Sequence, residues 1–398
     1  MLSKTLVLAL SLALGVLIWT GSRIAAEGQE RVPDRPAPGS PIDPARLDAR
    51  LAYLKRGINA SHWFAQVMDP RGYTAEHLAT HITPADLVLI KSLGFDHLRL
   101  SVDPTSIAGP DQPDVIAAER LDALAQAVAT ILAHGLAVIV DVHPSSDYKK
   151  KLQTDDAQVH TFVEFWRTLA MKLAGTDPER VFLELLNEPE FRDSYRWGGV
   201  QAKLAAAIRH RAPDHTIIAT GHRWSAIDDL LTLEPLADRN VVYTFHFYAP
   251  ALFTHQGATW GLGYWRHLRE LPYPASPDDL PRMTAGVPDD LTRLYLTRYG
   301  HERWSGERIG AEIGEAAAWA ARHGVRVICT EFGVYRRWAR PPDRARWIAD
   351  VRSVLERHGI GWTMWDYAGD FGIVTKQADR ISTEGDIVRA LGLPSPPE

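Results

Sequence analysis

The chain has 398 residues, 45% of them hydrophobic and 23% charged, which is typical of a soluble globular protein with one large domain or two ordinary ones. Its formal net charge of −5 leaves no basic footprint, so nucleic acid is not an expected partner. The single cysteine, Cys329, excludes an intramolecular disulfide, and its place inside an apolar run predicts a buried packing residue.

The first 26 residues have the organisation of an export signal. A lysine is followed by an apolar stretch at 5–19 and by small and polar residues at 22–26. This order predicts a secretory signal peptide cleaved near Ala25, and an uncleaved N-terminal anchor is the alternative. We therefore expect export to the periplasm or the medium, with membrane contact only if the segment is retained.

A change of composition separates this segment from the rest of the chain. Residues 27–48 begin with many Pro, Gly and charged residues and predict a flexible linker. From 49 to 395, strand-like and helical patterns alternate, as in βα units around a parallel sheet. The strand-like runs lie at 54–58, 95–102, 136–142, 181–186, 216–220, 241–247, 325–330 and 361–365. The helical patterns lie at 84–93, 117–134, 159–173, 199–211, 312–323 and 342–358.

Eight such runs with helices between them predict an α/β fold, a single (β/α)8 TIM barrel. The sixth run is followed by a long insertion, 249–307, which is rich in Pro and Gly. It holds the tryptophans and tyrosines Trp260, Tyr264, Trp265, Tyr273, Tyr295, Tyr299 and Trp304. Long loops at the carboxyl face of a barrel are usually functional, so we expect this one to line a binding cleft. A small satellite core is the alternative.

Two glutamates stand where buried strands stop. Glu188 follows the run 181–186, and Pro189 after it cannot continue a strand ladder. Glu331 ends a second run of the same design, with Gly333 two residues later. The carboxyl ends of the strands of a parallel barrel meet on one face, where barrel enzymes place their chemistry. The pattern predicts that the two carboxylates meet.

Other polar and aromatic side chains occupy the same strand ends. They are Arg99, His143, Asn187, His246, Tyr248 and Trp365. Trp63 and Trp224 each follow a strand end and are weaker candidates for sugar platforms. Any one of them has an ordinary structural explanation. On one face of one barrel, they would support Glu188 and Glu331, so that the whole set forms an acid, a nucleophile and their supporting residues.

With these residues in place, the sequence resembles glycoside hydrolase family 5, the cellulase family within the clan of retaining barrel glycosidases. The resemblance is carried by Leu186-Asn187-Glu188-Pro189 and Thr330-Glu331-Phe332-Gly333, and it covers residues 51–394. It implies that Glu188 is the acid/base and Glu331 the nucleophile. Retaining glycosidases need such a carboxyl pair about 5 Å apart.

The resemblance also implies roles for the supporting residues. Arg99 would favour the ionised form of Glu331, and Tyr248 would hydrogen-bond the same carboxylate. Asn187 would bind the 2-hydroxyl of the sugar, and His246 would orient Glu188. His143 would bind sugar hydroxyls, and Trp365 would be the stacking floor. Trp63 and Trp224 would serve further subsites.

The resulting expectation is an enzyme that cleaves β-linked polysaccharides or oligosaccharides, in the first place an endo-β-1,4-glucanase. A β-1,3-glucanase or a β-mannanase is the alternative within the family. A metal-dependent barrel hydrolase would need metal-ligand spacing such as His-x-His, which no strand end carries. A non-catalytic carbohydrate-binding barrel is the alternative from another class. Neither a metal nor a cofactor is expected.

Overall fold

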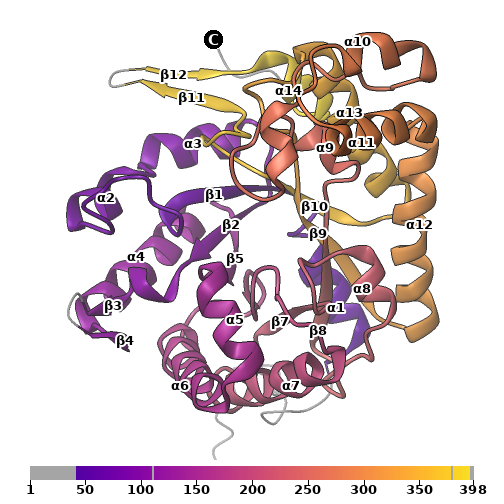
Figure 1. The fold of residues 1–398 in the computed structure, drawn as a ribbon. Helices are drawn as coiled ribbons and strands as arrows, with labels where there is room; N and C mark the ends of the chain where they lie inside the picture. Colours follow the sequence, from indigo (N-terminus) through magenta and orange to yellow (C-terminus); the bar gives the residue numbers. More distant parts are fainter. Residues whose placement is uncertain (1–41, 110–111, 378–379, 395–398) are drawn as a thin grey trace, which may run out of the picture. The chain divides into compact units, whose positions relative to one another are not determined.

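The computed structural model describes residues 42–109, 112–377 and 380–394. Within them, eight parallel strands close into a barrel in the order β1-β10-β9-β8-β7-β6-β5-β2. The strands are β1 (Arg56–Phe64), β2 (His97–Val102), β5 (Ala137–Val142), β6 (Val181–Glu184), β7 (Thr216–Thr220), β8 (Val241–Phe247), β9 (Arg326–Phe332) and β10 (Gly361–Met364). Closure pairs β1 with β10, and Figure 1 shows the indigo and yellow parts of the chain side by side. The predicted TIM barrel is confirmed.

Amphipathic helices cover the outside of the strands (Figure 1). They are α3 (Pro84–Ser92), α4 (Ala118–Ala133), α6 (Asp156–Leu173), α7 (Ser194–Arg211), α12 (Gly306–His323) and α13 (Pro341–Arg357). Four of them, α6, α7, α12 and α13, begin earlier than the hydrophobic pattern predicts. The side chains of Asp155 and Asp193 accept hydrogen bonds from backbone N–H groups of α6 and α7, respectively, and so extend these helices upstream of the first apolar residue.

Shorter helices and strands lie in the segments that connect the barrel strands and their helices. They are α2 (Ala75–Thr80), η1 (Pro104–Ser106), β3 (Ala108–Gly109), β4 (Gln112–Ile116), α5 (Ser146–Thr154) and α8 (Ile227–Leu231). After β10 come β11 (Val374–Gln377), β12 (Arg380–Thr383) and α14 (Gly385–Ala390). Strands and helices this short carry too little periodicity to be predicted from sequence, and none of them was predicted.

The insertion after β8 folds into a series of short helices. They are α9 (Ala251–Thr254), η2 (Gly263–His267), η3 (Pro277–Asp279), α10 (Leu280–Thr284) and α11 (Asp290–Glu302). Four of its aromatic residues are buried, namely Phe253, Tyr273, Tyr299 and Trp304. The hydroxyl of Tyr299 donates to the carbonyl of Pro272, and that of Tyr273 donates to Asp350. Much of the insertion is therefore a satellite core packed on the barrel.

A helix that the sequence did not predict closes the amino-terminal end of the barrel. Helix α1 (Pro44–Leu51) occupies residues that we expected to be flexible linker up to position 48, so that boundary was wrong. Pro44 fits the first helical turn, and Asp43 caps it. Leu47 packs in a cluster with Phe182 and Ile328 beneath the strands. The helix is stabilised by this packing, which composition does not reveal.

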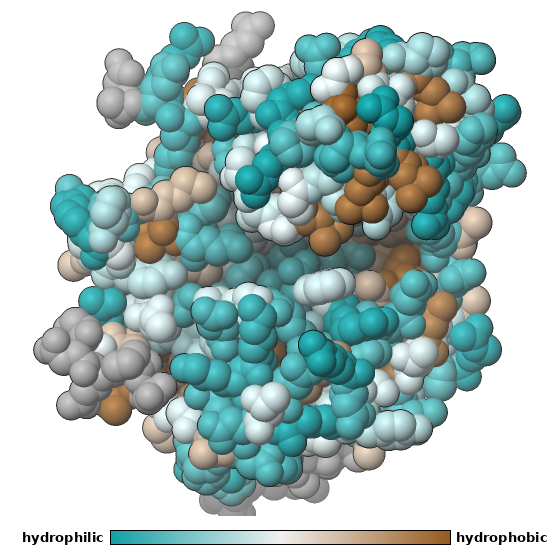
Figure 2. Space-filling model, viewed as in Figure 1, coloured by the Kyte–Doolittle hydropathy of each residue, from teal (hydrophilic) through white to brown (hydrophobic). Residues whose placement is uncertain are grey.

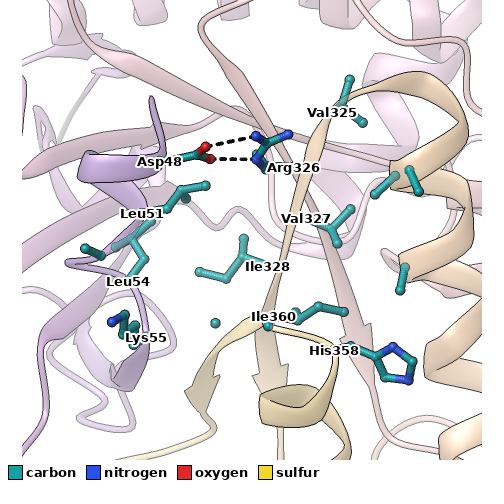
Figure 3. Close-up of a pocket in the computed structure, with 16 residues that line it drawn as sticks. Asp48, Leu51, Leu54, Lys55, Val325, Arg326, Val327, Ile328, His358 and Ile360 are labelled. Atoms are coloured by element: carbon teal, nitrogen blue, oxygen red, sulfur yellow. Dashed lines mark hydrogen bonds and ion pairs between the residues drawn. The ribbon is translucent and has the colours of Figure 1, made fainter. Parts of the chain in front are cut away.

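A pocket of about 520 Å³ lies beside α1 at this end (Figure 3). Leu51, Leu54 and Ile328 line it, and Asp48 accepts hydrogen bonds of 2.6 and 3.0 Å from Arg326 at its rim. It lies at the amino-terminal end of the barrel. In TIM-barrel enzymes this end contributes to stability, and catalysis takes place at the opposite end.

The predicted signal segment and most of the predicted linker lie outside the described residues. Among the helices at 42–109, 112–377 and 380–394, none has the length and apolarity needed to span a bilayer.

The buried guanidinium of Arg50 should be a main anchor of α1. Arg50 donates to the carbonyl of Asp214 at 2.6 Å, to Thr216 at 3.0 Å and to Glu179 at 2.9 Å. Arg50→Met would remove these three hydrogen bonds, although Asn240 still donates to the Asp214 carbonyl and Arg46 still pairs with Glu179. The loss of a buried cation with its partners should lower the free energy of unfolding by about 3 kcal/mol. Arg46→Met is the matched control, since Arg46 pairs with the same Glu179 from the surface and should change it by less than about 1 kcal/mol. Urea unfolding measures both, and equal effects would contradict the assignment.

Candidate active site

Arg99, on β2, lies fully buried at the centre of the barrel mouth. It makes a bidentate pair with Glu184 of β6, with 2.8 Å from Nε to Oε2 and 2.8 Å from Nη2 to Oε1. Its Nη2 lies 3.0 Å from Asp141 of β5, and its Nη1 donates to Glu331 of β9 at 2.7 Å. One guanidinium thus gathers three carboxylates from three strands.

Two amide side chains complete the surroundings of Arg99. Nη1 also donates to Oδ1 of Asn59 at 2.9 Å, and Nη2 donates to Oδ1 of Asn187 at 3.0 Å. The Nδ2 of Asn59 in turn donates to the carbonyls of Thr330 and Met364. An arginine has five N–H donors in a rigid fork, and all of them are engaged here. The mouth of the barrel is therefore held in one geometry.

Glu331 is buried, and both of its carboxylate oxygens are engaged. Oε1 accepts from Arg99, and Oε2 accepts from the hydroxyl of Tyr248 at 2.8 Å. Burial, together with the neighbouring carboxylate, raises the pKa of Tyr248, so this phenol remains a donor. Donors on both oxygens fix the rotamer of the Glu331 carboxylate. Glu331 is thereby held in one position at the mouth of the barrel.

Glu188 lies across the mouth in a different environment. Its side chain is 28% exposed, and Oε1 lies 3.0 Å from Nδ1 of His246. Desolvation raises the pKa of Glu188, although the positive charges of Lys149 and Arg99 oppose this shift. Its backbone adopts φ of 44°, a left-handed conformation that is unusual for a residue other than glycine. Glu188 is suited to carry a proton.

His143 is held as a neutral acceptor. Its Nδ1 lies 2.9 Å from Asp141, and its Nε2 accepts from the amides of Asn187 at 3.0 Å and Gln66 at 3.2 Å. Burial lowers the pKa of His143 to about 3, so the imidazole is uncharged near neutral pH. The ring of Trp365 stacks on that of His143, with centroids 5.6 Å apart. These residues form a polar wall and an aromatic floor beside the two glutamates.

The three candidate tryptophans have different surroundings. Trp365 is largely buried in a cluster with Tyr335 and Phe371, as a floor residue would be. Trp224 is 63% exposed, and its backbone N–H donates to the carbonyl of Pro189 at 2.8 Å, which places it beside Glu188. Trp63 is only 4% exposed, and its indole donates to the carbonyl of Leu78. Trp63 is a core residue, and the prediction that it serves a subsite was wrong.

The error at Trp63 has a local cause. The register between β1 and β2 shifts between Ala60 and Phe64, and His62 in this stretch has φ of 62°. The irregularity turns the Trp63 side chain into the core, and alternation along a regular strand does not predict it.

The fold brings together the other predicted residues at the carboxyl ends of the strands, and it adds four that the sequence reasoning missed. The additional residues are Asn59, Gln66, Asp141 and Glu184. Asp141 and Glu184 each interrupt an otherwise apolar strand, which is a signal that the sequence does contain. Gln66 follows β1 in a left-handed conformation and has no comparable signal.

Glu188, His246 and Glu331 offer ligand atoms that all lie within 4.8 Å of one another, so they could in principle hold a metal ion. Both oxygens of Glu331, however, already accept hydrogen bonds, one of them from the positive charge of Arg99. A cation would have to displace these donors and oppose that charge. The arrangement fits acid–base chemistry better than metal binding.

Comparison with known proteins agrees with this geometry. The profile of the cellulase family, glycosyl hydrolase family 5, matches residues 65–370. The chain belongs to glycosyl hydrolase family 5. It is therefore a glycoside hydrolase, and the resemblance noted in the sequence is confirmed.

Curated members of family 5 align with most of the chain. Endoglucanase C of Acetivibrio thermocellus is 28% identical over 341 residues, which cover 84% of this chain and 97% of that protein. Cellodextrinase A of Ruminococcus flavefaciens is 25% identical and covers 77% of this chain and 83% of its own. Endoglucanase Cel5A of Thermotoga maritima has a similar structure, with a TM-score of 0.69 at 23% identity over 87% of this chain and 99% of that one. At this identity, the structural likeness concerns the fold.

Lys149 should tune the protonation of Glu188. It lies on α5, largely buried, and its Nζ is 3.1 Å from Glu190. Since its charge lowers the pKa of Glu188, Lys149→Met should raise that pKa. The predicted acid role of Glu188 implies that activity is lost as pH rises through its pKa. The basic limb of the kcat/KM profile should therefore move up by roughly half a pH unit in Lys149→Met.

The matched control for this change is Lys150→Met. Lys150 is the next residue of α5 but is exposed and pairs with Asp147. Its substitution should leave the profile in place. A basic limb that is unmoved, or that moves to lower pH, in Lys149→Met would contradict the tuning role.

Two tryptophans of the insertion should respond differently to truncation. Trp260 is 46% exposed and meets the edge of the Tyr335 ring at 5.0 Å, whereas Trp265 stacks on His255 at 4.7 Å within the satellite core. Trp260→Ala should reduce kcat/KM on a polymer about three- to tenfold and leave a short aryl glycoside unaffected. Trp265→Ala should instead lower Tm and reduce activity on both substrates. Equal polymer and aryl-glycoside losses in Trp260→Ala would assign it to the core as well.

Proposed function

We propose that the protein is a retaining endo-β-1,4-glucanase. The family supplies glycoside hydrolysis, and relatives that align over most of this chain are named endoglucanases. The β-1,4 linkage is the one named for a similar structure, a hyperthermophilic endo-β-1,4-glucanase with a TM-score of 0.68. Endoglucanase C of Acetivibrio thermocellus and endoglucanase 3 of Fibrobacter succinogenes both match more than three quarters of this chain. A β-1,4-linked glucan is therefore the substrate that the comparisons favour.

The observation that carries the mechanism is the unequal treatment of two neighbouring carboxyl groups. One oxygen of Glu188 and one of Glu331 lie within 4.8 Å of each other. This spacing suits direct attack by a carboxylate and leaves no room for a water molecule between it and the sugar, as an inverting enzyme would need. Both oxygens of Glu331 accept hydrogen bonds, from Arg99 and Tyr248, while desolvation raises the pKa of Glu188. Such a pair divides into nucleophile and acid.

In the first step, a carboxylate oxygen of Glu331 attacks the anomeric carbon. The bond from this carbon to the glycosidic oxygen breaks, and Glu188 gives its proton to the departing oxygen. The result is a glycosyl ester on Glu331 and an ionised Glu188. The second N–H of Asn187 Nδ2 is free to donate to a sugar hydroxyl while the first donates to His143.

In the second step, a water molecule enters from the side that the leaving sugar has vacated. Glu188 takes a proton from the water, the water oxygen attacks the anomeric carbon, and the ester bond to Glu331 breaks. Both glutamates return to their initial protonation states, and the anomeric configuration is retained. Water is the only co-reactant, so the reaction requires no cofactor.

The surface around these residues supports binding of a polymer. Figure 2 shows the carboxyl face hollowed across its width, with the insertion on one side and the region of α5 on the other. Trp365 floors the centre, Trp224 stands exposed beside Glu188, and Trp260 contacts Tyr335 of the floor cluster. Several aromatic platforms around the carboxyl pair suit a chain that extends beyond the cleaved bond, which is the requirement for internal cleavage.

Export remains a prediction from residues 1–26. A polymeric glucan is too large to cross a membrane, so an enzyme acting on it has to meet it outside the cytoplasm. Detection of the mature N-terminus near residue 26 in the periplasm or medium would support a cleaved signal.

A panel of polysaccharides tests the proposal. Carboxymethyl cellulose should lose viscosity early in relation to the reducing ends formed, and NMR of the first products should show the β-anomer. Laminarin and β-mannan should be cleaved at least tenfold more slowly. Glu331→Gln is the inactive control, since it keeps the shape of the side chain and removes its charge. Faster cleavage of mannan or laminarin would replace the proposed linkage with one of the two alternatives.

A further inference from the structure

A chain of buried hydrogen bonds leads away from the candidate acid. Nε2 of His246 lies 3.2 Å from the hydroxyl of Thr330, and this hydroxyl lies 2.6 Å from that of Thr244. The Thr244 hydroxyl in turn lies 3.1 Å from the carbonyl oxygen of Ile328. Both threonines are fully buried on β8 and β9. The mechanism described above does not use them.

The end of the chain fixes its direction. A carbonyl oxygen can only accept, and the carbonyls of Ile328 at 3.1 Å and Phe245 at 3.4 Å both lie within reach of the Thr244 hydroxyl, so we assign its proton to the nearer one, Ile328. The oxygen of Thr244 already accepts from the backbone N–H of Thr330 at 3.2 Å, and its second lone pair is left for the Thr330 hydroxyl. Thr330 therefore donates to Thr244 and presents its own lone pairs to His246. The nitrogen that faces them, Nε2, then carries the hydrogen.

This arrangement determines what Glu188 meets. Burial lowers the pKa of His246 to about 4, so the ring is neutral near pH 7 and has hydrogen on one nitrogen only. With that hydrogen on Nε2, Nδ1 is a bare lone pair 3.0 Å from Oε1 of Glu188. A protonated Glu188 donates to it, whereas an ionised Glu188 faces it lone pair against lone pair.

We propose that Thr244 and Thr330 are positioning residues that hold His246 as the Nε2–H tautomer, so that its Nδ1 accepts the proton of Glu188. The inference rests on the proposed role of Glu188 as acid/base. In the first step, this chain of hydrogen bonds keeps Glu188 protonated. In the second, the bare Nδ1 makes the Glu188 carboxylate more basic, which assists removal of a proton from water.

Other charged and titratable groups also act on this pair. Those that influence Glu188 or His246 are Arg99 on β2, His143 after β5, Lys149 on α5, Glu184 on β6, Glu190 after β6 and Glu331 on β9. Substitution of Thr330 alters none of them. A change confined to the hydroxyl chain therefore isolates its contribution.

The test compares three variants in the full chain. Thr330→Val keeps the shape and removes the hydroxyl, which leaves the Nε2–H without an acceptor and favours the opposite tautomer. His246 would then donate from Nδ1 to an ionised Glu188 and lower its pKa. The basic limb of kcat/KM on an aryl cellobioside should move to lower pH by about one unit, the size of one hydrogen bond to a charged group. Thr330→Ser should restore the wild-type limb.

Thr220→Val is the matched control. Thr220 is equally buried, and its hydroxyl donates to the backbone carbonyl of Thr244 at 2.9 Å, outside the chain of hydroxyls. Its substitution should leave the pH profile unchanged even if Tm falls. An unchanged basic limb in Thr330→Val, or the same shift in Thr220→Val, would overturn the proposal.

NMR of nitrogen-15-labelled histidine reads the tautomer directly and needs no substrate. Wild-type His246, assigned by its loss in His246→Gln, should show hydrogen on Nε2, and Thr330→Val should show it on Nδ1. Hydrogen on Nδ1 in the wild type would refute the proposal. An enzyme that fails to cleave any glucan but has hydrogen on Nε2 would refute the proposed function and leave this inference standing.

Discussion

The contact on which the rest of the site depends is the buried guanidinium of Arg99. Its donors bind oxygens from β1, β5, β6 and β9. The rotamer of Glu331, the position of Asn187 and the arrangement of the barrel mouth therefore all depend on this one side chain. A buried arginine without partners would destabilise the folded state, because its charge would be neither solvated nor paired. Three buried carboxylates close together without the arginine would destabilise it further, because they would also repel one another. The same contact therefore stabilises the fold and prepares the chemistry.

The excess of negative charge around Arg99 also explains how two glutamates come to differ. One positive charge faces Asp141, Glu184 and Glu331, and burial raises the pKa of Asp141 to about 6 and raises that of Glu184. Glu331 is nearer the opening and accepts one hydrogen bond from Arg99 and one from Tyr248. Glu188 lies outside this group and meets the neutral His246 instead. Geometry, rather than residue type, assigns the two roles.

Sequence reasoning reached the barrel and its two glutamates because both features repeat along the chain. Eight apolar runs separated by helices are compatible with few folds other than a barrel. Glu188 and Glu331 each follow such a run. The partners of Arg99 were harder to predict. Asp141 and Glu184 are visible as polar residues within apolar strands, but which side chain meets which depends on strand register around a closed barrel.

The remaining errors concern packing that no local pattern records. Trp63 turns inward because of an irregularity in β1, and α1 is stabilised by contacts with strands that lie far from it in sequence. The insertion combines both outcomes that its composition allowed, since Tyr273 and Tyr299 are buried while Trp260 is exposed. Burial of a given aromatic residue is a property of the whole fold.

The left-handed backbone at Glu188 has a consequence for how this barrel could be recombined with others. Such a conformation costs on the order of 1–3 kcal/mol and persists only where its surroundings enforce it. Here Pro189 accepts from the N–H of Trp224, which is itself left-handed with φ of 48°, and Phe191 donates to His222. The loops after β6 and β7 are thus one mechanical unit. A chimera that exchanges one of them alone would release the strain and misdirect the Glu188 side chain, so in modular design the two loops have to be transplanted together.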